Sequence, residues 1–195
     1  EVLLVEDNPG DARLAHKVRA ARRLLEKSKF YDYARELASR ISGDCQRGGG
    51  ICDFVIVTGG GPGIMEASNR GASDVGAKSL GLNIVLPFEQ EPNAYITPEL
   101  CFQFHYFAIR KMHFLMRAKA LVAFPGGYGT FDELFETLTL IQTKKIKPLP
   151  VILFGREFWK KVIDFELLAD EGVISPEDTE LIQFVETPGE AWKII

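Results

Sequence analysis

The segment from Ala120 to Gln142 constrains the fold more than any other part of this 195-residue chain. Its apolar start, Ala120 to Phe124, predicts a buried strand, and the turn-forming letters PGGYGT follow directly. The apolar residues then recur at spacings of three and four, which predicts an amphipathic helix: Phe131, Leu134, Phe135, Leu138 and Ile141. A strand, a glycine turn and a helix in this order form a phosphate cradle. Glycine lets the backbone approach a ligand, and the helix start offers unpaired N–H groups and a positive dipole end.

Two interpretations are open for Glu133, which follows Thr130 by three residues. Thr130 is a favourable N-cap residue, so the pair forms a capping box in which the glutamate only satisfies the helix start. Alternatively, Glu133 is a reactive carboxylate on the rim of the phosphate cradle. The spacing alone does not separate a structural role from a catalytic one.

A second glycine turn follows the apolar run from Asp53 to Thr58, which predicts another buried strand. The turn residues are Gly59, Gly60, Gly61, Pro62 and Gly63. Such glycines make a second anion-binding nest, or they allow a helix to pack tightly on a strand. We favour the nest, because two such turns in one small α/β chain suggest a shared nucleotide crevice.

The remaining pattern alternates strands with helices. Strands are predicted over Lys78 to Pro87, Leu149 to Gly155, Phe184 to Val185 and, near the start of the chain, Val2 to Val5. Helices are predicted over Asp11 to Ser42 with a break near residues 27–29, over His105 to Ala118, over Glu157 to Glu171, after the N-cap Ser175, and over Pro188 to Ile195. This alternation predicts a single Rossmann-like α/β domain, an open parallel sheet with helices on both faces.

Two segments beside the glycine turns have features that bear on a site. The helix from His105 to Ala118 is apolar on more than one face, so we expect it to be buried. It carries Arg110 and Lys111, whose charges then need a phosphate, a carboxylate or a subunit interface as partner. The polar segment from Phe88 to Pro98 is predicted to be a loop and a lid.

The composition and charge of the chain exclude some classes of binding partner and favour one cellular compartment. The net charge is −4, and the positive residues that crowd between Lys17 and Lys29 are best explained as a solvated helix face, so no nucleic-acid surface is expected. No apolar run is long enough to span a bilayer, and no signal peptide is visible. Three cysteines, spaced for neither a zinc site nor a disulfide framework, favour a reducing cytoplasm.

The string PGGYGTFDE, from Pro125 to Glu133, resembles the PGGxGTxxE signature of the LOG family, the cytokinin-activating phosphoribohydrolases often mislabelled "lysine decarboxylases". The resemblance covers roughly residues 53–192, because Arg110-Lys111 and the earlier glycine run also stand in the family's order. It implies that Arg110 and Glu133 are the catalytic residues. The expected substrate-binding residues, from the glycine turns and the resemblance together, are Gly59, Gly60, Gly61, Glu99, Lys111, Gly126, Gly127, Tyr128, Gly129, Thr130 and Thr139.

The resemblance implies hydrolysis of an AMP-type nucleotide, with or without an N6 modification, to a free base and ribose 5-phosphate. It also implies a homodimer or larger homo-oligomer that needs no metal or organic cofactor, and the cysteines add the expectation of a cytoplasmic protein. The residues suit this chemistry: two glycine nests hold a 5′-phosphate, and Arg110 offers a planar fork of donors. A carboxylate such as Glu133 stabilises positive charge at the sugar C1′ and activates water.

The first part of the chain departs from the family pattern. LOG proteins usually open with a strand that ends in a Gly-Ser turn, and no such turn stands here. The opening letters EVLLVEDNPGDARL instead resemble the start of a response-regulator receiver domain, although the later aspartate and lysine of a receiver are not found in order. We therefore divide the chain into a divergent N-terminal segment, 1–50, and a nucleotide-binding catalytic core, 51–195.

Three other functions fit the sequence less well. A pyridoxal-phosphate lysine decarboxylase needs a Schiff-base lysine and an acidic partner for the pyridine nitrogen, and no such set is apparent. A dinucleotide-dependent oxidoreductase lacks its GxGxxG after the first strand. A nucleotide-sensing module that binds without hydrolysis would keep the glycine nests, but it has no need for Arg110 and Glu133 together.

Overall fold

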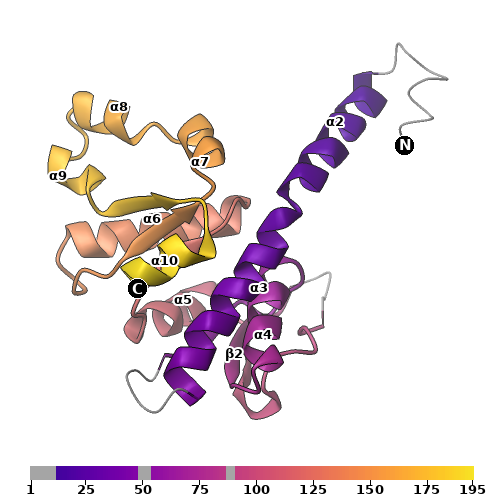
Figure 1. Ribbon diagram of the computed structural model, residues 1–195. Coiled ribbons are helices and arrows are strands. Elements are labelled where there is room, and N and C mark those ends of the chain that lie inside the picture. Colours follow the sequence, from indigo (N-terminus) through magenta and orange to yellow (C-terminus); the bar gives the residue numbers. More distant parts are fainter. Residues whose placement is uncertain (1–11, 48–53, 87–90) are drawn as a thin grey trace.

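The computed structural model describes residues 12–47, 54–86 and 91–195 (Figure 1). Its six strands are β1 (Ile56–Thr58), β2 (Ser79–Ile84), β3 (Cys101–Phe104), β4 (Leu121–Ala123), β5 (Val151–Phe154) and β6 (Ile182–Val185). They form two three-stranded sheets, in the orders β1-β2-β3 and β4-β5-β6, and every pair is parallel. The predicted parallel α/β fold is therefore confirmed, but its strands are hydrogen-bonded as two sheets instead of one.

The helices in chain order are α2 (Ala12–Lys27), α3 (Lys29–Ser42), α4 (Ile64–Asp74), α5 (Phe107–Met116), α6 (Tyr128–Gln142), α7 (Arg156–Val162), α8 (Phe165–Asp170), α9 (Pro176–Thr179) and α10 (Pro188–Ile194). A short π-helix, η1 (Gly43–Arg47), follows α3, and a 3₁₀ turn, η2 (Pro98–Leu100), precedes β3. The predicted break near residues 27–29 is confirmed at Ser28. The predictions for Val2 to Val5, for residues 48–50 and for residues 88–90 lie outside the described residues.

Two predicted elements differ from the structure. The single helix expected from Glu157 to Glu171 is interrupted, because Asp164 caps a new helix by accepting a hydrogen bond from the Leu167 N–H at 3.0 Å. The strand β3 was not predicted, and the helix expected from His105 begins only at Phe107. The four residues of β3 belong to the sheet because their backbone pairs with β2, which no local pattern of so short a segment specifies.

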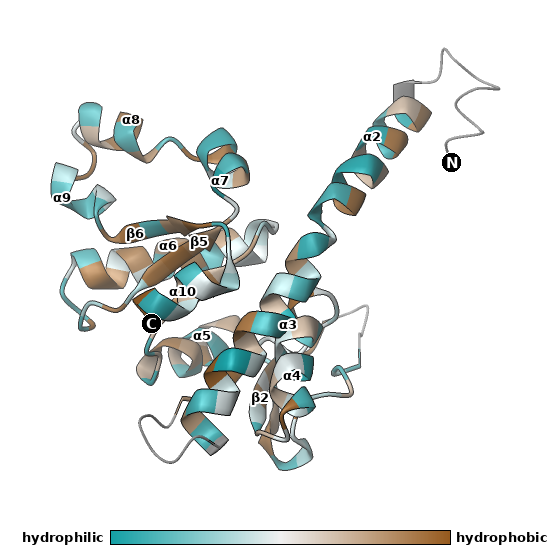
Figure 2. Cartoon of the chain, viewed as in Figure 1, coloured by the Kyte–Doolittle hydropathy of each residue, from teal (hydrophilic) through white to brown (hydrophobic). Residues whose placement is uncertain are grey.

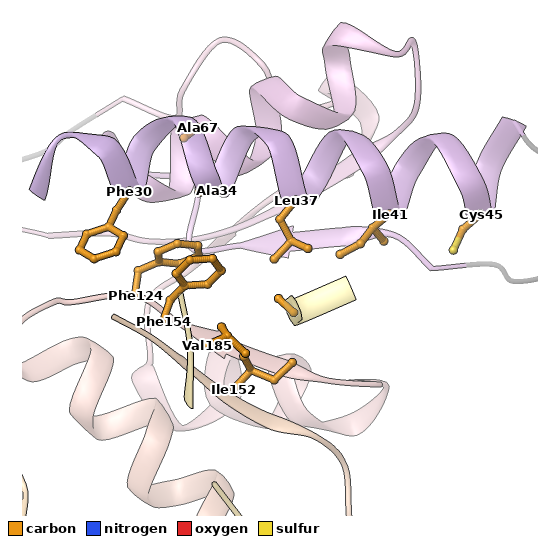
Figure 3. Packing of buried hydrophobic residues seen from close by; sticks show 11 residues of the cluster. Phe30, Ala34, Leu37, Ile41, Cys45, Ala67, Phe124, Ile152, Phe154 and Val185 are labelled. Atoms are coloured by element: carbon orange, nitrogen blue, oxygen red, sulfur yellow. The ribbon is translucent and has the colours of Figure 1, made fainter. Parts of the chain in front are cut away.

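The helix α3 lies across the middle of the molecule (Figure 1), and its apolar face packs into a core that also contains residues of α4 and of the second sheet (Figure 3). Fully or nearly buried members of this core are Phe30, Ala34, Leu37, Ile41, Cys45, Ala67, Phe124, Ile152, Phe154, Val185 and Ala191. The rings of Phe124 and Phe154 stack with their centroids 4.5 Å apart. One continuous core that takes in α3, α4 and the second sheet makes this a single α/β domain.

The second sheet has helices on both of its faces. The strand β5 is apolar along its length (Figure 2), and its side chains alternate between two cores. Ile152 and Phe154 join the core under α3, whereas Val151 and Leu153 join a second core that contains Leu134 and Ile141 of α6 and Trp159 of α7. This alternation fixes α6, which carries Glu133, against the sheet.

Two features outside the cores complete the description. The helix α2 projects away from the domain (Figure 1), and its cationic residues Lys17, Arg19, Arg22 and Arg23 are exposed, as expected of a solvated face. Cys45 is disulfide-bonded, although the spacing of the cysteines was predicted not to suit a disulfide framework, and Cys101 is free.

Candidate active site

The glycine turn after β4 leads directly into α6, which begins at Tyr128 with Gly127 as its N-cap residue. Thr130 is therefore the third helical residue and not the N-cap, and Glu133 is the sixth. The capping-box interpretation of these two residues is wrong, because a capping glutamate must stand at the third helical position. Thr130 instead packs its side chain on the turn, where a Cβ on Gly126 would lie 2.2 Å from the Thr130 Oγ1.

The start of α6 keeps its first N–H groups unpaired. Gly127 offers no side chain to cap the helix, and the amides of Tyr128 and Gly129 have no acceptor among the described residues. A helix start in this state attracts an anion, since the free N–H groups and the positive end of the dipole point the same way. The geometry therefore retains the features predicted for a phosphate cradle.

The earlier glycine turn is a tightly packed support for other side chains. A Cβ on Gly59 would lie 2.6 Å from the Arg110 Nη2, so the guanidinium rests directly on this glycine. Gly60 has φ +76°, and a Cβ there would lie 1.8 Å from the Asn83 Oδ1. The Gly60 N–H already donates to the Thr58 Oγ1 at 3.0 Å. Close packing thus requires the glycines at 59 and 60, and the Gly60 amide is not free for an anion.

Arg110 lies in the first turn of α5 and reaches across to the first sheet. Its Nε donates to the backbone oxygen of Leu82 in β2 at 2.7 Å, and its guanidinium carbon lies 5.0 Å from the centre of the Phe114 ring. Burial lowers the pKa of Arg110, and the charges of Glu133 and Asp132 oppose that shift. An arginine remains cationic in proteins, so Arg110 is a fixed, partly desolvated positive charge.

Glu133 lies on α6, close enough to Arg110 for the charge of the guanidinium to affect the pKa of its carboxyl group. Its Oε2 is buried and has no hydrogen-bond partner among the described residues. Burial raises the pKa of Glu133, Arg110 opposes that rise, and the neighbouring Glu136 adds to it. A buried carboxyl whose pKa is raised beside a cation is the environment that enzymes use for general acid–base groups.

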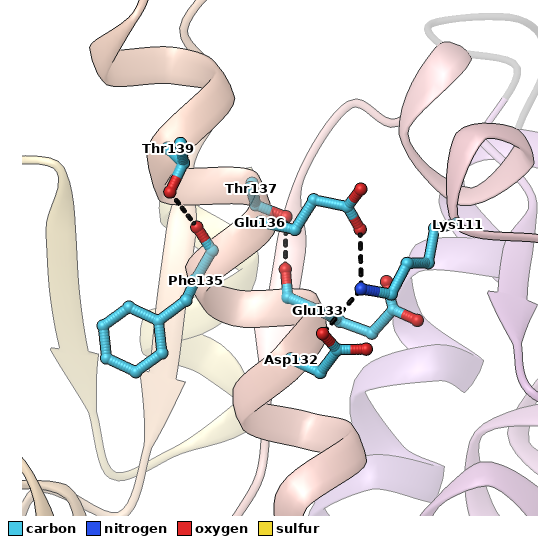
Figure 4. A network of polar contacts seen from close by, with 7 residues as sticks. All are labelled: Lys111, Asp132, Glu133, Phe135, Glu136, Thr137 and Thr139. Atoms are coloured by element: carbon cyan, nitrogen blue, oxygen red, sulfur yellow. Dashed lines mark hydrogen bonds and ion pairs between the residues drawn. The ribbon is translucent and has the colours of Figure 1, made fainter. Parts of the chain in front are cut away.

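Lys111 links the two helices of the site. Its Nζ lies 2.5 Å from the Asp132 Oδ1 and 3.5 Å from the Glu136 Oε2, so it pairs α5 with α6 (Figure 4). The side chain is mostly buried. Although Lys111 was predicted to contact the nucleotide, its described contacts are with these two carboxylates, which precede and follow Glu133 along α6.

Two predicted binding residues are not brought to Arg110 and Glu133 within one chain. Glu99 lies in η2, before the first residue of β3, and pairs with Lys78 at 3.2 Å. It is therefore at the amino-terminal edge of the parallel sheet, opposite the glycine turns. Thr139 lies about 9 Å further along the axis of α6 than Glu133. Its hydroxyl donates to the Phe135 backbone oxygen at 2.7 Å (Figure 4).

A polar network beneath the earlier glycine turn was not predicted. The Thr58 hydroxyl donates to the Asn69 Oδ1 at 2.7 Å, and the Asn69 Nδ2 donates to the Ser79 Oγ at 2.9 Å. Asn93 joins this network and also holds the turn, although it lies in the segment that the sequence predicts to be a lid. The residues come from four separate segments, so only their meeting in the fold reveals them.

Comparison with known proteins agrees with this architecture. Residues 65–195 match the family described as "Possible lysine decarboxylase". The cytokinin riboside 5′-monophosphate phosphoribohydrolase LOG3 of Arabidopsis thaliana is 27% identical over 173 residues, which are 86% of this chain and 75% of that protein. The pyrimidine/purine nucleotide 5′-monophosphate nucleosidase of Escherichia coli K12 is 30% identical over 154 residues, 74% of this chain, and the matched part is 31% of that longer protein.

A solved structure shares the fold. The molybdenum cofactor carrier protein of Chlamydomonas reinhardtii superposes with a TM-score of 0.56 at 20% identity, over 85% of this chain and 84% of that one. Fold and glycine turns together define a Rossmann-like α/β protein. Within that class the chain belongs to the family of possible lysine decarboxylases, which is the LOG family. None of the helices in the described ranges is long and apolar enough to cross a membrane.

Proposed function

We propose that this chain is a hydrolase that cleaves the N-glycosidic bond of a nucleoside 5′-monophosphate. The observation that carries the proposal is the buried, unpaired carboxyl oxygen of Glu133 beside the cation of Arg110 and the free N–H groups that start α6. The relatives named as nucleotide nucleosidases and phosphoribohydrolases support the same reaction. The products are the free base and ribose 5-phosphate.

Each group has a role that its position supports. The start of α6, from Gly126 to Thr130, takes the 5′-phosphate and so fixes the sugar beside Glu133. As the bond from C1′ to the base nitrogen breaks, positive charge develops on the sugar, and the Glu133 carboxylate stabilises it. Glu133 also accepts a proton from the water whose oxygen forms the new bond to C1′. The base departs with the electrons of the broken bond and takes up a proton from solvent, and Glu133 then returns its proton to solvent. Arg110 binds the sugar hydroxyls or the phosphate and holds Glu133 in its ionised form.

An adenine nucleotide, with or without an N6 substituent, is the proposed substrate. The test is to incubate the purified protein with AMP, N6-isopentenyl-AMP, GMP and CMP, and to quantify free base and ribose 5-phosphate. We expect release from the adenine nucleotides, and the ratio of their rates measures the importance of the N6 group. Binding of every nucleotide without release from any would contradict the hydrolase and favour a nucleotide-sensing module.

The acid limb of the pH–rate profile reports the ionisation of Glu133. The pKa of this carboxyl is raised and the ionised form is the active one, so we expect kcat/KM to fall about tenfold per pH unit below a pKa higher than that of an ordinary glutamate. Glu136 contributes to the rise, so Glu136→Gln should move the limb to lower pH. The measurement is kcat/KM for AMP across the acid range, with exposed Glu177→Gln as the control. An unchanged limb in Glu136→Gln would show that another group controls it.

A homodimer is proposed on the exposed face of α5. This helix was expected to be buried, yet Ile109, Met112 and Met116, which share one face at helical spacing, are 47% to 57% exposed in the single chain. Such an apolar face beside Arg110 fits contact with a second copy of the chain, which would place the sites at the dimer contact.

We expect sedimentation equilibrium to show a dimer for the wild type and a monomer for Met112→Glu, because a charge would then be buried in an apolar contact. Val173→Glu is the matched control, since Val173 is also exposed but lies in the α8–α9 loop. It should leave the dimer intact. A monomeric wild type, or dissociation by both variants alike, would contradict the proposed interface.

A further inference from the structure

The segment from Glu91 to Thr97 is fastened along the first sheet at several points. The Thr97 N–H donates to the Ser79 backbone oxygen at 3.2 Å, and the Thr97 Oγ1 accepts from the Ser79 N–H at 3.0 Å. Ile96 is buried, and a Cβ on Gly81 would lie 2.5 Å from its Cδ1. This part of the predicted lid is therefore a strap across β2, which we call the 91–97 strap.

Asn93 is the residue through which the 91–97 strap holds the earlier glycine turn. Its backbone N–H donates to the Gly60 oxygen at 2.8 Å. Its Nδ2 lies 3.1 Å from the oxygens of both Gly60 and Gly61, and 3.0 Å from the Asn69 Oδ1. Its Oδ1 accepts from the Tyr95 N–H at 3.2 Å. Every polar atom of the Asn93 side chain is thus engaged, and both glycine carbonyls are directed toward it.

The glycine turn that Asn93 holds is also the surface on which Arg110 rests. Gly59 immediately precedes the fastened glycines and leaves no room for a Cβ beside the Arg110 Nη2. On its other side, the guanidinium is held by the hydrogen bond from its Nε to the Leu82 oxygen. A small shift of the turn would therefore displace the guanidinium from its place near Glu133.

We propose that Asn93 is a positioning residue for Arg110, which acts by fixing the carbonyls of Gly60 and Gly61 so that Gly59 supports the guanidinium. The proposal rests on the proposed function, in which Arg110 serves the hydrolysis. Asn93 lies on the glycine turn and not at the start of α6, where the phosphate binds. Its loss should therefore lower kcat, because the guanidinium is displaced from Glu133, and raise the KM for AMP by a smaller factor, because Arg110 also contacts the substrate while the start of α6 is unchanged.

The test compares Asn93→Asp, Asn93→Ala and the control Thr97→Val. Asn93→Asp keeps the shape of the side chain but places a carboxylate oxygen against the oxygens of Gly60, Gly61 and Asn69. Because these oxygens repel each other, we expect kcat to fall roughly a hundredfold. Asn93→Ala loses the side-chain donors without adding a charge and should fall roughly tenfold. Thr97→Val removes an acceptor from the same strap without touching the glycine turn, so it should lower the melting temperature but not kcat.

A spectroscopic readout makes the inference independent of turnover. The Nε–H of Arg110 donates to a backbone oxygen, so it should give a protected ¹⁵N–¹H signal, assigned by its loss in Arg110→Met. Asn93→Ala should shift or broaden this signal, and Thr97→Val should not. In addition, Asn93→Ala should cause no further loss of rate in the Arg110→Met background, because its effect passes through the arginine.

The outcomes separate the two proposals. An unchanged Arg110 signal in Asn93→Ala, an equal change in Thr97→Val, or a full further loss of rate in Arg110→Met would overturn the positioning role. A wild-type protein that releases no base would overturn the proposed hydrolase instead, and the Arg110 signal alone would then decide whether Asn93 positions the guanidinium.

Discussion

Glu133→Gln is expected to abolish base release from AMP, by at least about 10³-fold, while the melting temperature at neutral pH stays the same or rises. The amide has the shape of the carboxylate but neither stabilises positive charge on the sugar nor accepts a proton from water. Stability should not fall, because Glu133 is the sixth residue of α6 and caps nothing. Its Oε2 is buried without a hydrogen-bond partner in the described part of the chain, so the neutral amide relieves the cost of burying a charge.

The pH dependence of that stability has a definite sign. The pKa of Glu133 is raised in the folded chain, so folding must bury the carboxylate above the folded-state pKa and must take up a proton between the unfolded-state and folded-state values, and both cost stability. A gain in stability from Glu133→Gln should therefore be present at neutral pH. It should disappear as the pH falls through the folded-state pKa and then below the unfolded value, where the wild-type carboxyl is also neutral.

The measurements for Glu133→Gln are kcat for AMP and thermal melting at several pH values. Glu66→Gln is the matched control, because Glu66 lies in the first turn of α4 and accepts a hydrogen bond from the Tyr31 hydroxyl at 2.8 Å. That variant should show the opposite result, with turnover retained and stability slightly lowered. Wild-type turnover with a lower melting temperature in Glu133→Gln would assign the glutamate a structural role.

Arg110→Lys is expected to lower kcat/KM for AMP at least about a hundredfold although it keeps the positive charge. Lysine has no planar fork, so it cannot donate from Nε to the Leu82 oxygen and still present two further N–H groups to a ligand. Arg117→Lys, at the exposed C-terminal end of the same helix, is the control and should retain the wild-type rate. If Arg110→Lys also retained the wild-type kcat/KM, the arginine would act only through its charge.

Local sequence signals predicted the elements whose residues interact with near neighbours along the chain. The glycine turn before Tyr128, the break at Ser28 and the cap at Ser175 all follow from residues within a few positions of one another. The alternating burial of β5 follows from period-two geometry. The predicted N-cap of α6, Thr130, lies three residues after the observed one because threonine is the better N-cap in isolation, whereas here Gly127 makes the turn and Thr130 packs on Gly126.

Features that depend on tertiary or quaternary contacts could not be predicted from the sequence alone. The apolar residues of α5 led to the prediction that this helix is buried, but the structure of a single chain leaves one of its apolar faces exposed. The hydrogen bond from the Asn93 side chain to the Gly60 oxygen joins residues more than thirty positions apart. The roles proposed for Arg110 and Glu133 come from the family resemblance, and the structure adds that Gly59 supports the arginine and that Glu133 is free of a capping role.

The most direct test of the proposed reaction is to supply AMP in H₂¹⁸O and analyse the products promptly by mass spectrometry. Attack of water at C1′ predicts one ¹⁸O atom in ribose 5-phosphate, none in the released adenine, and no such products from Glu133→Gln. AMP that remains intact, or adenine release without label in the sugar phosphate, would contradict hydrolysis of the N-glycosidic bond at this site.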